Sequence, residues 1–235
     1  MKKVAIITGA SKGIGKCLAG ILVSNGYTVV NASRSKPSEK TDCFFIKTDV
    51  TKKESCKKMI EAAIRKFRRI DLFVNNAGVL YPDTIESMNG KTLKENFETD
   101  VFGTVFCSYF IAKHMSRQKS GQIVNIASSA GMSFREGLLS YTAAKWSVVG
   151  FTGALRMEMQ KHGVDVICFC PGGTRTSLFS HYKEDVSKDF MDPDELAGKI
   201  FEAMNRPEEK KWLFVYMRKD RILKKFGFED YPVQQ

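Results

Sequence analysis

Short runs of apolar, often β-branched residues alternate along this chain with longer amphipathic segments. The runs are almost continuously hydrophobic, as strands covered on both faces of a sheet must be. We predict strands at Val4–Thr8, Thr28–Ala32, Phe44–Lys47, Leu72–Asn75, Ile123–Ile126, Val164–Cys170 and Trp212–Tyr216. The periodicity of apolar positions between them predicts helices at residues 13–25, 52–69, 90–118, 139–161 and 193–205.

This alternation predicts an α/β fold, a Rossmann-type doubly wound parallel sheet of about seven strands with helices on both faces. One connection should differ from the rest. Residues 34–42 are too few and too polar for a full helix, and Pro37 interrupts them, so we expect a loop. No internal repeat, low-complexity tract or interdomain linker is visible. We therefore expect residues 1–235 to form a single domain.

Composition and charge narrow the possible partners. The formal net charge is +11, but the lysines are spread along all 235 residues and form no basic-aromatic module. We interpret them as a solvated surface rather than a nucleic-acid site, and an anionic cofactor or an acidic carrier protein stays open. The six cysteines show no C-x-x-C spacing and the three histidines are scattered. We expect free thiols and no metal site.

No segment predicts a membrane partner. The apolar run after the first three residues is too short for the core of a signal peptide. No stretch approaches the roughly 20 apolar residues that a transmembrane helix needs. We expect a cytoplasmic protein.

A glycine-rich turn follows the first predicted strand and opens the first helix. Its sequence is Thr8-Gly-Ala-Ser-Lys-Gly-Ile-Gly15. Glycines allow a tight turn and a close approach of the backbone to a pyrophosphate, which meets the positive end of the helix dipole. A glycine cluster alone is weak evidence, but the strand before it and the helix after it strengthen the prediction of a dinucleotide site.

The end of the second predicted strand distinguishes NADP from NAD. An NAD site usually carries an acid there for the adenosine ribose, whereas this chain has Ser33 and Arg34. Arg34 can bind a 2′-phosphate with its planar guanidinium, and Lys12 offers a second cation on the same side. We therefore predict NADP(H). At the adenine end we assign Asp49 and Val50, although Asp49 or Thr51 could equally be the N-cap of the next helix.

Tyr141, Lys145 and Ser128 form the candidate catalytic group. Tyr141 and Lys145 are four residues apart, so on a helix they share a face. A nearby lysine charge favours the phenolate and lowers the pKa of a tyrosine from its usual value of about 10. Ser128, thirteen residues before Tyr141, is placed to hydrogen-bond a carbonyl or alcohol oxygen. Taken alone, the Tyr-Lys spacing is common on ordinary helices.

With these motifs the chain resembles the short-chain dehydrogenase/reductase family, in the single-domain branch of about 250 residues. The resemblance runs from Lys3 to about Thr176. It rests on the glycine turn, on the N-N-A-G motif from Asn75 to Gly78, on Ser128 with Y-x-x-x-K at Tyr141, and on P-G-x-x-x-T from Pro171. The order and the separations of these motifs are those of the family.

The resemblance implies roles for individual residues. Tyr141 is the general acid in reduction and the base in oxidation, Lys145 lowers its pKa and binds the nicotinamide ribose, and Ser128 orients the substrate oxygen. The spacing to Tyr141 selects Ser128, and Ser129 is interpreted as structural. The implied cofactor-binding residues are Thr8, Gly9, Ser11, Lys12, Gly13, Ile14, Gly15, Ser33, Arg34, Asp49, Val50, Asn76, Ala77, Gly78, Tyr141, Lys145, Pro171, Gly172, Thr174 and Thr176. Relatives commonly form homodimers or homotetramers.

Asp100 departs from the family pattern. The family usually has asparagine at this position, where it helps to hold a water that relays protons through the lysine. An ionised aspartate accepts hydrogen bonds but cannot donate one, and it can also pair with Lys145. We count Asp100 among the catalytic candidates as a substitute in this relay. Asn96, one helical turn earlier, could take over part of this role, but we interpret it as a helix-surface residue.

The C-terminal part departs as well, because the D-G-G-like turn of many relatives is missing. We expect a substrate lid at about residues 177–191, rich in Phe179, His181, Tyr182 and Phe190, and a basic tail at residues 217–235.

The sequence thus predicts an NADP(H)-dependent oxidoreductase that interconverts a carbonyl and a secondary alcohol of a small molecule. A narrower alternative is a 3-oxoacyl-thioester reductase acting on an acyl carrier protein. An alternative of another class is a non-catalytic NADPH-binding regulator, for which Asp100 is the sequence support.

Overall fold

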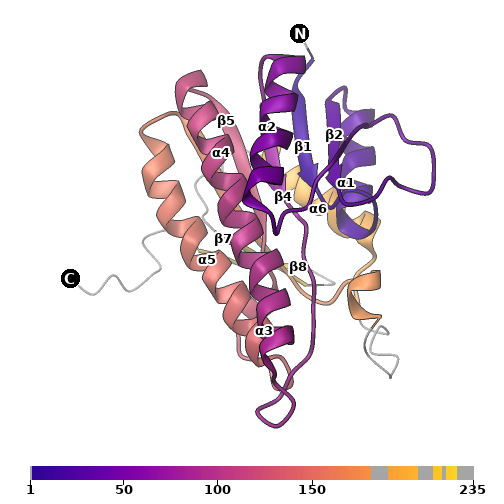
Figure 1. The fold of residues 1–235 in the computed structure, drawn as a ribbon, viewed down its shortest axis with the longest axis vertical. Coiled ribbons are helices and arrows are strands. Elements are labelled where there is room, and N and C mark those ends of the chain that lie inside the picture. Colours follow the sequence, from indigo (N-terminus) through magenta and orange to yellow (C-terminus); the bar gives the residue numbers. More distant parts are fainter. Residues whose placement is uncertain (1, 181–189, 206–213, 219–220, 227–235) are drawn as a thin grey trace.

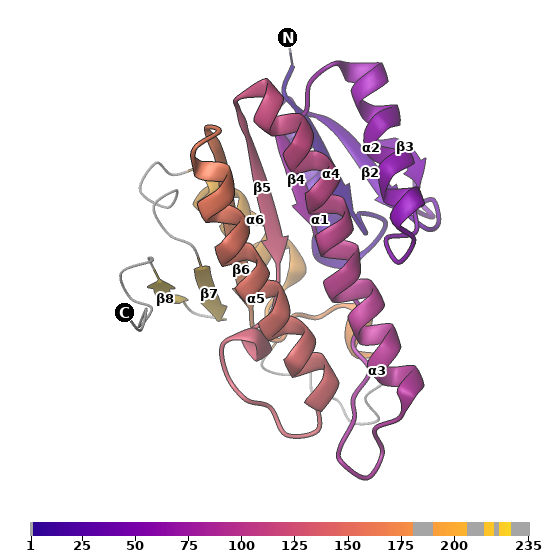
Figure 2. The ribbon, with the colours of Figure 1, turned by 60° about the vertical axis from the view of Figure 1, so that its left-hand side comes forward.

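The chain folds around one sheet of eight strands with the order β3-β2-β1-β4-β5-β6-β7-β8 (Figures 1 and 2). The computed structural model describes residues 2–180, 190–205, 214–218 and 221–226. The strands are β1 (Val4–Thr8), β2 (Thr28–Ser33), β3 (Phe44–Lys47), β4 (Leu72–Asn75), β5 (Gly121–Ile126), β6 (Val164–Pro171), β7 (Phe214–Arg218) and β8 (Arg221–Phe226).

The first seven strands are parallel, which confirms the doubly wound α/β sheet. The eighth, β8, pairs antiparallel with β7 and lies in the segment expected to be a tail. Its alternation of basic and apolar residues is short, and the sequence analysis missed it. Met217 and Arg218 of the expected tail are the last residues of β7. Residues 219–220 and 227–235 of that tail lie outside the described part of the chain, as does Trp212 at the start of the last predicted strand.

The helices begin and end within a few residues of their predicted limits. They are α1 (Gly13–Ser24), α2 (Lys53–Phe67), α3 (Gly90–Asn96), α4 (Gly103–Gln118), α5 (Leu139–Gln160) and α6 (Pro193–Asn205). The long helix predicted at residues 90–118 is interrupted, because a π-helical segment, η1 (Phe97–Phe102), joins α3 to α4. The connection from β2 to β3 contains no helix, as its composition predicted.

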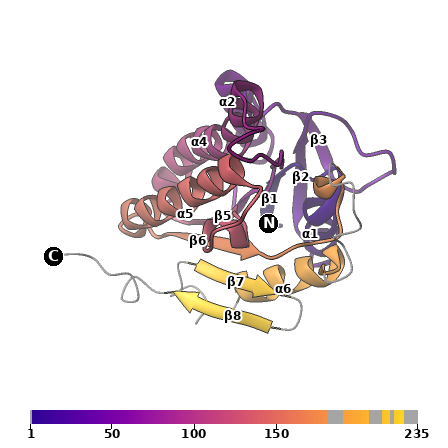
Figure 3. The same ribbon diagram turned by 90° about the horizontal axis from the view of Figure 1, so that it is seen from below.

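Alternate side chains of each inner strand enter separate cores on the two faces of the sheet. Along β1, Ala5 and Ile7 belong to a core that includes residues of α1 and α6, whereas Val4 and Ile6 belong to one that includes residues of α2 and α4. Figure 3 shows α2, α4 and α5 on one side of the sheet and α6 on the other. This two-sided burial explains why the strand sequences are continuously hydrophobic.

The strand order reverses beside β1, and this reversal places the functional cleft. β1 pairs with β2 on one side and with β4 on the other, so the chain leaves neighbouring strands toward opposite faces. In open parallel sheets such a switch point opens a crevice at the carboxyl ends of the strands.

A buried polar network joins the sheet to the helices that cover it. The Asn75 amide donates to Ser108 Oγ (2.9 Å) and to Asn125 Oδ1 (2.8 Å). The Asn125 amide in turn donates to Thr152 Oγ1 (2.9 Å), and this hydroxyl donates to the carbonyl of Val148 (2.6 Å). These hydrogen bonds thus fix β4, β5, α4 and α5 relative to one another. Because the side chains are buried, water cannot replace a bond that is lost.

We expect Thr152→Val to lower the free energy of unfolding by about 1–3 kcal/mol, because it leaves the buried Asn125 amide without its acceptor. Thr142→Val on the same helix is the matched control, because the buried Thr142 hydroxyl has no hydrogen-bond partner within the described residues. Urea denaturation of both variants measures the difference. Equal stabilities of the two variants would show that the network contributes nothing.

Candidate active site

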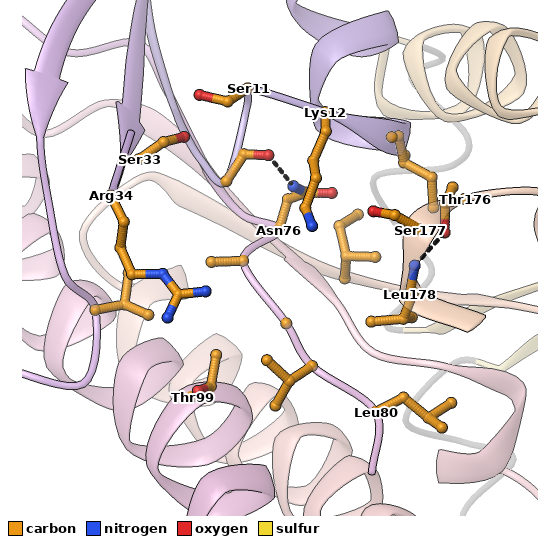
Figure 4. Close-up of a pocket in the computed structure, with 18 of the residues that line it drawn as sticks. Ser11, Lys12, Ser33, Arg34, Asn76, Leu80, Thr99, Thr176, Ser177 and Leu178 are labelled. Carbon is orange, nitrogen blue, oxygen red and sulfur yellow. Dashed lines mark hydrogen bonds between the residues drawn. The ribbon is translucent and has the colours of Figure 1, made fainter. Parts of the chain in front are cut away.

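A cleft of about 450 Å³ lies over the carboxyl ends of the strands, at the switch point (Figure 4). The turn after β1 and the ends of β2 and β3 form one side. The loops after β4, β5 and β6 form the other, and Lys145 of α5 also lines the cleft. Sequence segments far apart in the chain therefore meet at one opening.

The glycine turn after β1 is packed directly on the loop after β4. Gly9 has φ +70°, and a Cβ there would lie 2.9 Å from Ala77 Cα. Thr8 Oγ1 accepts hydrogen bonds from the backbone N–H groups of Asn76 (3.0 Å) and Ala77 (3.1 Å). The Asn76 amide donates to the carbonyls of Thr8 (2.9 Å) and Gly9 (3.3 Å). Thr8 and Asn76 thus have a structural role, because their hydrogen bonds hold the turn after β1 against the loop after β4.

The N-terminus of α1 opens into the cleft and suits an anion. Its first turn contains no acidic residue, and the cap residue, Lys12, makes no side-chain capping hydrogen bond. Gly13, the first helical residue, has φ +56°. Free N–H groups, the positive end of the helix dipole and a lysine side chain therefore meet at one place. These residues fit the pyrophosphate of a dinucleotide.

Two cations from neighbouring segments on one side of the cleft point into it. Figure 4 shows Lys12 coming from the turn after β1 and Arg34 from the end of β2. Within the described residues neither has an acidic side chain at ion-pair distance. Ser33 is buried and donates to Asn31 Oδ1 (2.6 Å), and Ser11 donates to the carbonyl of Ser35 (2.7 Å). The hydroxyls support the wall while the two charges face the opening.

Asp49 lines the cleft beside Val50, but it does not cap the next helix. The cap of α2 is Lys52, which makes no side-chain capping bond, so both N-cap alternatives for this position were wrong. Asp49 Oδ1 instead accepts from the backbone N–H (3.1 Å) and the hydroxyl (2.8 Å) of Thr51. These bonds fix the direction of the carboxylate at the rim.

Tyr141 and Lys145 lie on the first turns of α5, both almost fully buried. Lys145 Nζ is 5.4 Å from the centroid of the Tyr141 ring. Burial lowers the pKa of Lys145, but Asp100 and Tyr141 oppose it, and the pKa lies above its usual value. The lysine is therefore charged at neutral pH beside the phenol.

An apolar cluster covers the phenol on the side of the cleft. Leu80 packs with Tyr141 and Ala130, and Leu178 and Phe179 lie against them. Ser128 begins the short turn after β5, where its Oγ accepts from the N–H of Ala130 (3.2 Å). Ser129 is buried, and its carbonyl accepts from the Ser133 hydroxyl (2.9 Å).

A buried carboxylate lies behind Lys145. Asp100 Oδ2 is 3.5 Å from Lys145 Nζ, and Asp100 Oδ1 accepts from the backbone N–H of Val79 (3.0 Å). Burial raises the pKa of Asp100, and Lys145 and the Val79 N–H oppose that rise. The pairing with Lys145 that the sequence left open is thus present in the structure.

Asn96 is fully buried, which corrects its interpretation as a helix-surface residue. Its Oδ1 accepts from the Tyr81 N–H (3.1 Å), and its Nδ2 donates to the Tyr81 carbonyl (3.1 Å) and to Ser140 Oγ (2.8 Å). Asp83, from the same loop as Tyr81, accepts from the N–H of Ser140 (3.0 Å). Two side chains thus hold the residue that precedes Tyr141. The sequence signal for the burial of Asn96 was its position four residues before Asp100, on the same face of the helix.

The segment after β6 closes the far side of the cleft. Pro171, Gly172, Thr174 and Thr176 line it, as predicted from the motif. Beyond Thr176, the Phe179 ring lies 4.6 Å from the Phe190 ring, centroid to centroid. His181 and Tyr182 of the expected lid lie outside the described residues.

Most of the predicted cofactor-binding residues line the cleft, and five of the predicted site residues do not. Thr8 and Gly15 lie beneath the turn, and Ser128, Tyr141 and Asp100 lie beyond the apolar cluster or behind Lys145. The sequence analysis also missed several lining residues from the loop after β4 and from η1, which are Val79, Leu80, Tyr81 and Thr99. Only the position of Val79 directly after N-N-A-G offered a signal.

The described part of the chain contains no cluster of acidic, cysteine and histidine side chains that could hold a metal ion. Among the described helices, none has the length and apolar character needed to cross a membrane.

Known proteins are similar to this chain in both sequence and architecture. A diacetyl reductase [(S)-acetoin forming] of Staphylococcus epidermidis is 34% identical over 87% of this chain and 83% of its own length. A 3-oxoacyl-[acyl-carrier-protein] reductase of Synechocystis is 31% identical over 84% and 87%. The solved structure of ElxO with NADP bound has 28% identity and a TM-score of 0.79, covering 89% of this chain and 94% of that one. The family model described as short chain dehydrogenase matches residues 3–187. The chain belongs to the short-chain dehydrogenase family.

Proposed function

We propose that this protein reduces a carbonyl group of a small molecule to a secondary alcohol with NADPH, and that Tyr141 donates the proton. One observation carries the proposal. Lys145 lines the same cleft as Lys12 and Arg34, and its Nζ is 5.4 Å from the centroid of the buried Tyr141 ring. A candidate proton donor thus lies beside the cleft that fits a phosphorylated dinucleotide.

The turn after β1 is the proposed site of the pyrophosphate. Gly9 and Gly13 adopt positive φ, so the backbone approaches the ligand without a side chain in between. The N-terminus of α1 then faces the phosphate oxygens. The nicotinamide supplies a hydride when it is bound, and the protein supplies position and charge.

Lys12 and Arg34 are the proposed partners of the adenosine 2′-phosphate. No acid lies at the end of β2, where it would repel that phosphate, and both cations face the cleft (Figure 4). NADP or NADPH is named in the solved structures of ElxO, which supports the same preference here. Asp49 and Val50 are then proposed to line the adenine.

The proton transfer is assigned to the phenol. The Tyr141 O–H gives its proton to the oxygen of the carbonyl as the carbon accepts the hydride, and Lys145 stabilises the resulting phenolate. Ser128 is proposed to donate a hydrogen bond to the same substrate oxygen. Solvent in the cleft then returns a proton to Tyr141 past Lys145, which lines the cleft.

An uncharged ketone or diketone fits the substrate end best. The residues that cover Tyr141 from the cleft are apolar, namely Leu80, Leu178 and Phe179. The similarity to a diacetyl reductase supports a small dicarbonyl compound, and the similarity to a 3-oxoacyl carrier-protein reductase supports a thioester as second candidate. A panel with diacetyl and acetoacetyl thioesters, followed by NADPH consumption, separates the two.

A homodimer or homotetramer is a further part of the proposal. Phe102 and Tyr109 of η1 and α4 and Trp146 of α5 are large apolar side chains exposed on adjacent helices. Such exposure is typical of a surface that a second copy covers.

Replacing Tyr141 by phenylalanine removes only the hydroxyl from the buried ring. We expect kcat/KM for carbonyl reduction to fall about 100- to 10,000-fold, the usual contribution of a general acid, while the Kd for NADPH stays within about twofold. Steady-state rates and calorimetric titration measure the two quantities. Unchanged turnover in the variant would remove Tyr141 from the mechanism.

Arg34→Ala tests the preference for the phosphorylated cofactor. We expect kcat/KM for NADPH to fall roughly 10- to 100-fold and that for NADH to change little, because a charge-assisted hydrogen bond to the 2′-phosphate is lost. Lys36→Ala is the matched control, since Lys36 is exposed two residues away and does not line the cleft. The assignment fails if both variants lose NADPH selectivity equally or neither loses it.

A further inference from the structure

The carboxylate behind the catalytic lysine is completely enclosed. The Asp100 side chain has no exposed surface, and the Lys145 side chain is 7% exposed. A Cβ at Gly78 would lie 2.9 Å from Asp100 Oδ1 and 3.6 Å from Lys145 Nζ, so the backbone of the loop after β4 lies directly on the pair. Bulk water therefore does not screen the two charges from each other or from their neighbours.

The position of Asp100 is fixed from two sides. Oδ1 accepts a hydrogen bond from the N–H of Val79, and Oδ2 lies 3.5 Å from Lys145 Nζ and has no hydrogen-bond partner among the residues that the structure describes. The π-helical segment η1 carries the residue into this position between α3 and α4. Segments of this kind occur often at functional sites.

The other titratable groups facing the lysine come from α5 and β6. Tyr141 lies on α5, and Cys168 and Cys170 lie on β6. A hydrogen bond with Cys168 and burial raise the pKa of the Cys170 thiol well above its usual value, so it stays neutral. At neutral pH the charge felt by the phenol is therefore set by the ammonium of Lys145 and the carboxylate of Asp100.

We propose that Asp100 offsets the charge of Lys145 as Tyr141 experiences it, so that Tyr141 keeps its proton to a higher pH than it would beside an unpaired lysine. This inference rests on the proposed function, in which Tyr141 is the proton donor. An ammonium alone attracts the negative phenolate, whereas an ammonium paired with a carboxylate presents a dipole whose field falls off faster. Asp100 acts through Lys145 and is a positioning residue rather than a catalytic one.

The consequence is a wider pH range for carbonyl reduction. Reduction needs the protonated phenol, and oxidation needs the phenolate. A group that keeps the proton on Tyr141 therefore extends the pH range in which the rate of reduction is constant, and it moves the increase in the rate of oxidation to higher pH. Burial raises the pKa of Asp100, so the offset is lost first in acid. The phenol is protonated there in any case, and reduction is not affected.

Asp100→Asn tests the proposal. Asparagine is nearly isosteric, retains an acceptor for the Val79 N–H, removes the negative charge and places an NH2 group where Oδ2 faces Lys145. We expect the alkaline limb of kcat/KM for reduction and the rising limb for oxidation to move to lower pH by about one unit. Glu98→Gln is the matched control, since Glu98 lies on the same segment and pairs with Lys94 at the surface (3.8 Å), and its limbs should stay in place.

A second readout does not depend on turnover. The ionisation of Tyr141 is followed by the ultraviolet absorbance of its phenolate as the pH is raised. The same titration of a protein that also carries Tyr141→Phe is subtracted, which removes the signal of the other tyrosines. The midpoint of the Tyr141 ionisation should be about one pH unit lower in Asp100→Asn than in the unaltered chain. If the unaltered chain reduces no carbonyl yet this midpoint shifts, the proposed function fails and the charge effect stands.

An unchanged midpoint, or a shift to higher pH, overturns the inference. Should Asp100→Asn fail to fold, Asp100→Ser is used, which also lacks the charge and keeps an oxygen acceptor. We expect the midpoint of the Tyr141 titration to shift downward in Asp100→Ser as well. A midpoint that does not shift in this variant would also contradict the proposal.

Discussion

The site depends on the contact between the turn after β1 and the loop after β4. Thr8 Oγ1 accepts two backbone N–H groups of that loop, and the Asn76 amide returns two hydrogen bonds to the turn. A glycine is required at position 9 because a Cβ would meet the Ala77 backbone. The contact joins two strands that are neighbours in the sheet but 68 residues apart in the sequence. This contact therefore fixes the turn at the N-terminus of α1 relative to the loop after β4, which is in turn bonded to the start of α5.

Further hydrogen bonds connect the loop after β4 to the start of α5. The loop after β4 is held by Asp100 at Val79 and by Asn96 at Tyr81, and Asn96 also binds Ser140. The buried polar residues of α3 and η1 therefore set the distance between the cofactor cleft and the helix that carries Tyr141. Because each is fully enclosed, losing one leaves unpaired backbone groups that water cannot reach. Stability and function share the same side chains here.

The sequence predicted the first six strands and the helices well because two-sided burial leaves a continuous apolar record in each strand. Local motifs placed Lys12, Arg34 and Lys145 at the cleft. The π-helical segment and β8 were not predicted, since a π turn differs from an α turn only in hydrogen-bond register and β8 depends on pairing with β7. The burial of Asn96 was also missed, because its partners are the Tyr81 backbone, 15 residues away, and the Ser140 hydroxyl, 44 residues away. Periodicity reveals which face is apolar, but it does not reveal which polar side chain a distant loop will cover.

The central claim is that NADPH binds in the cleft and that Tyr141, beside Lys145, donates a proton to a carbonyl. The most direct measurement is a single turnover, in which excess protein with bound NADPH is mixed with diacetyl or another member of a ketone panel and the nicotinamide absorbance is followed. The account predicts a decay of full amplitude, with one equivalent of alcohol formed for each NADPH consumed. Tight binding of NADPH with no decay on any carbonyl would contradict it and would identify the protein as a binding module.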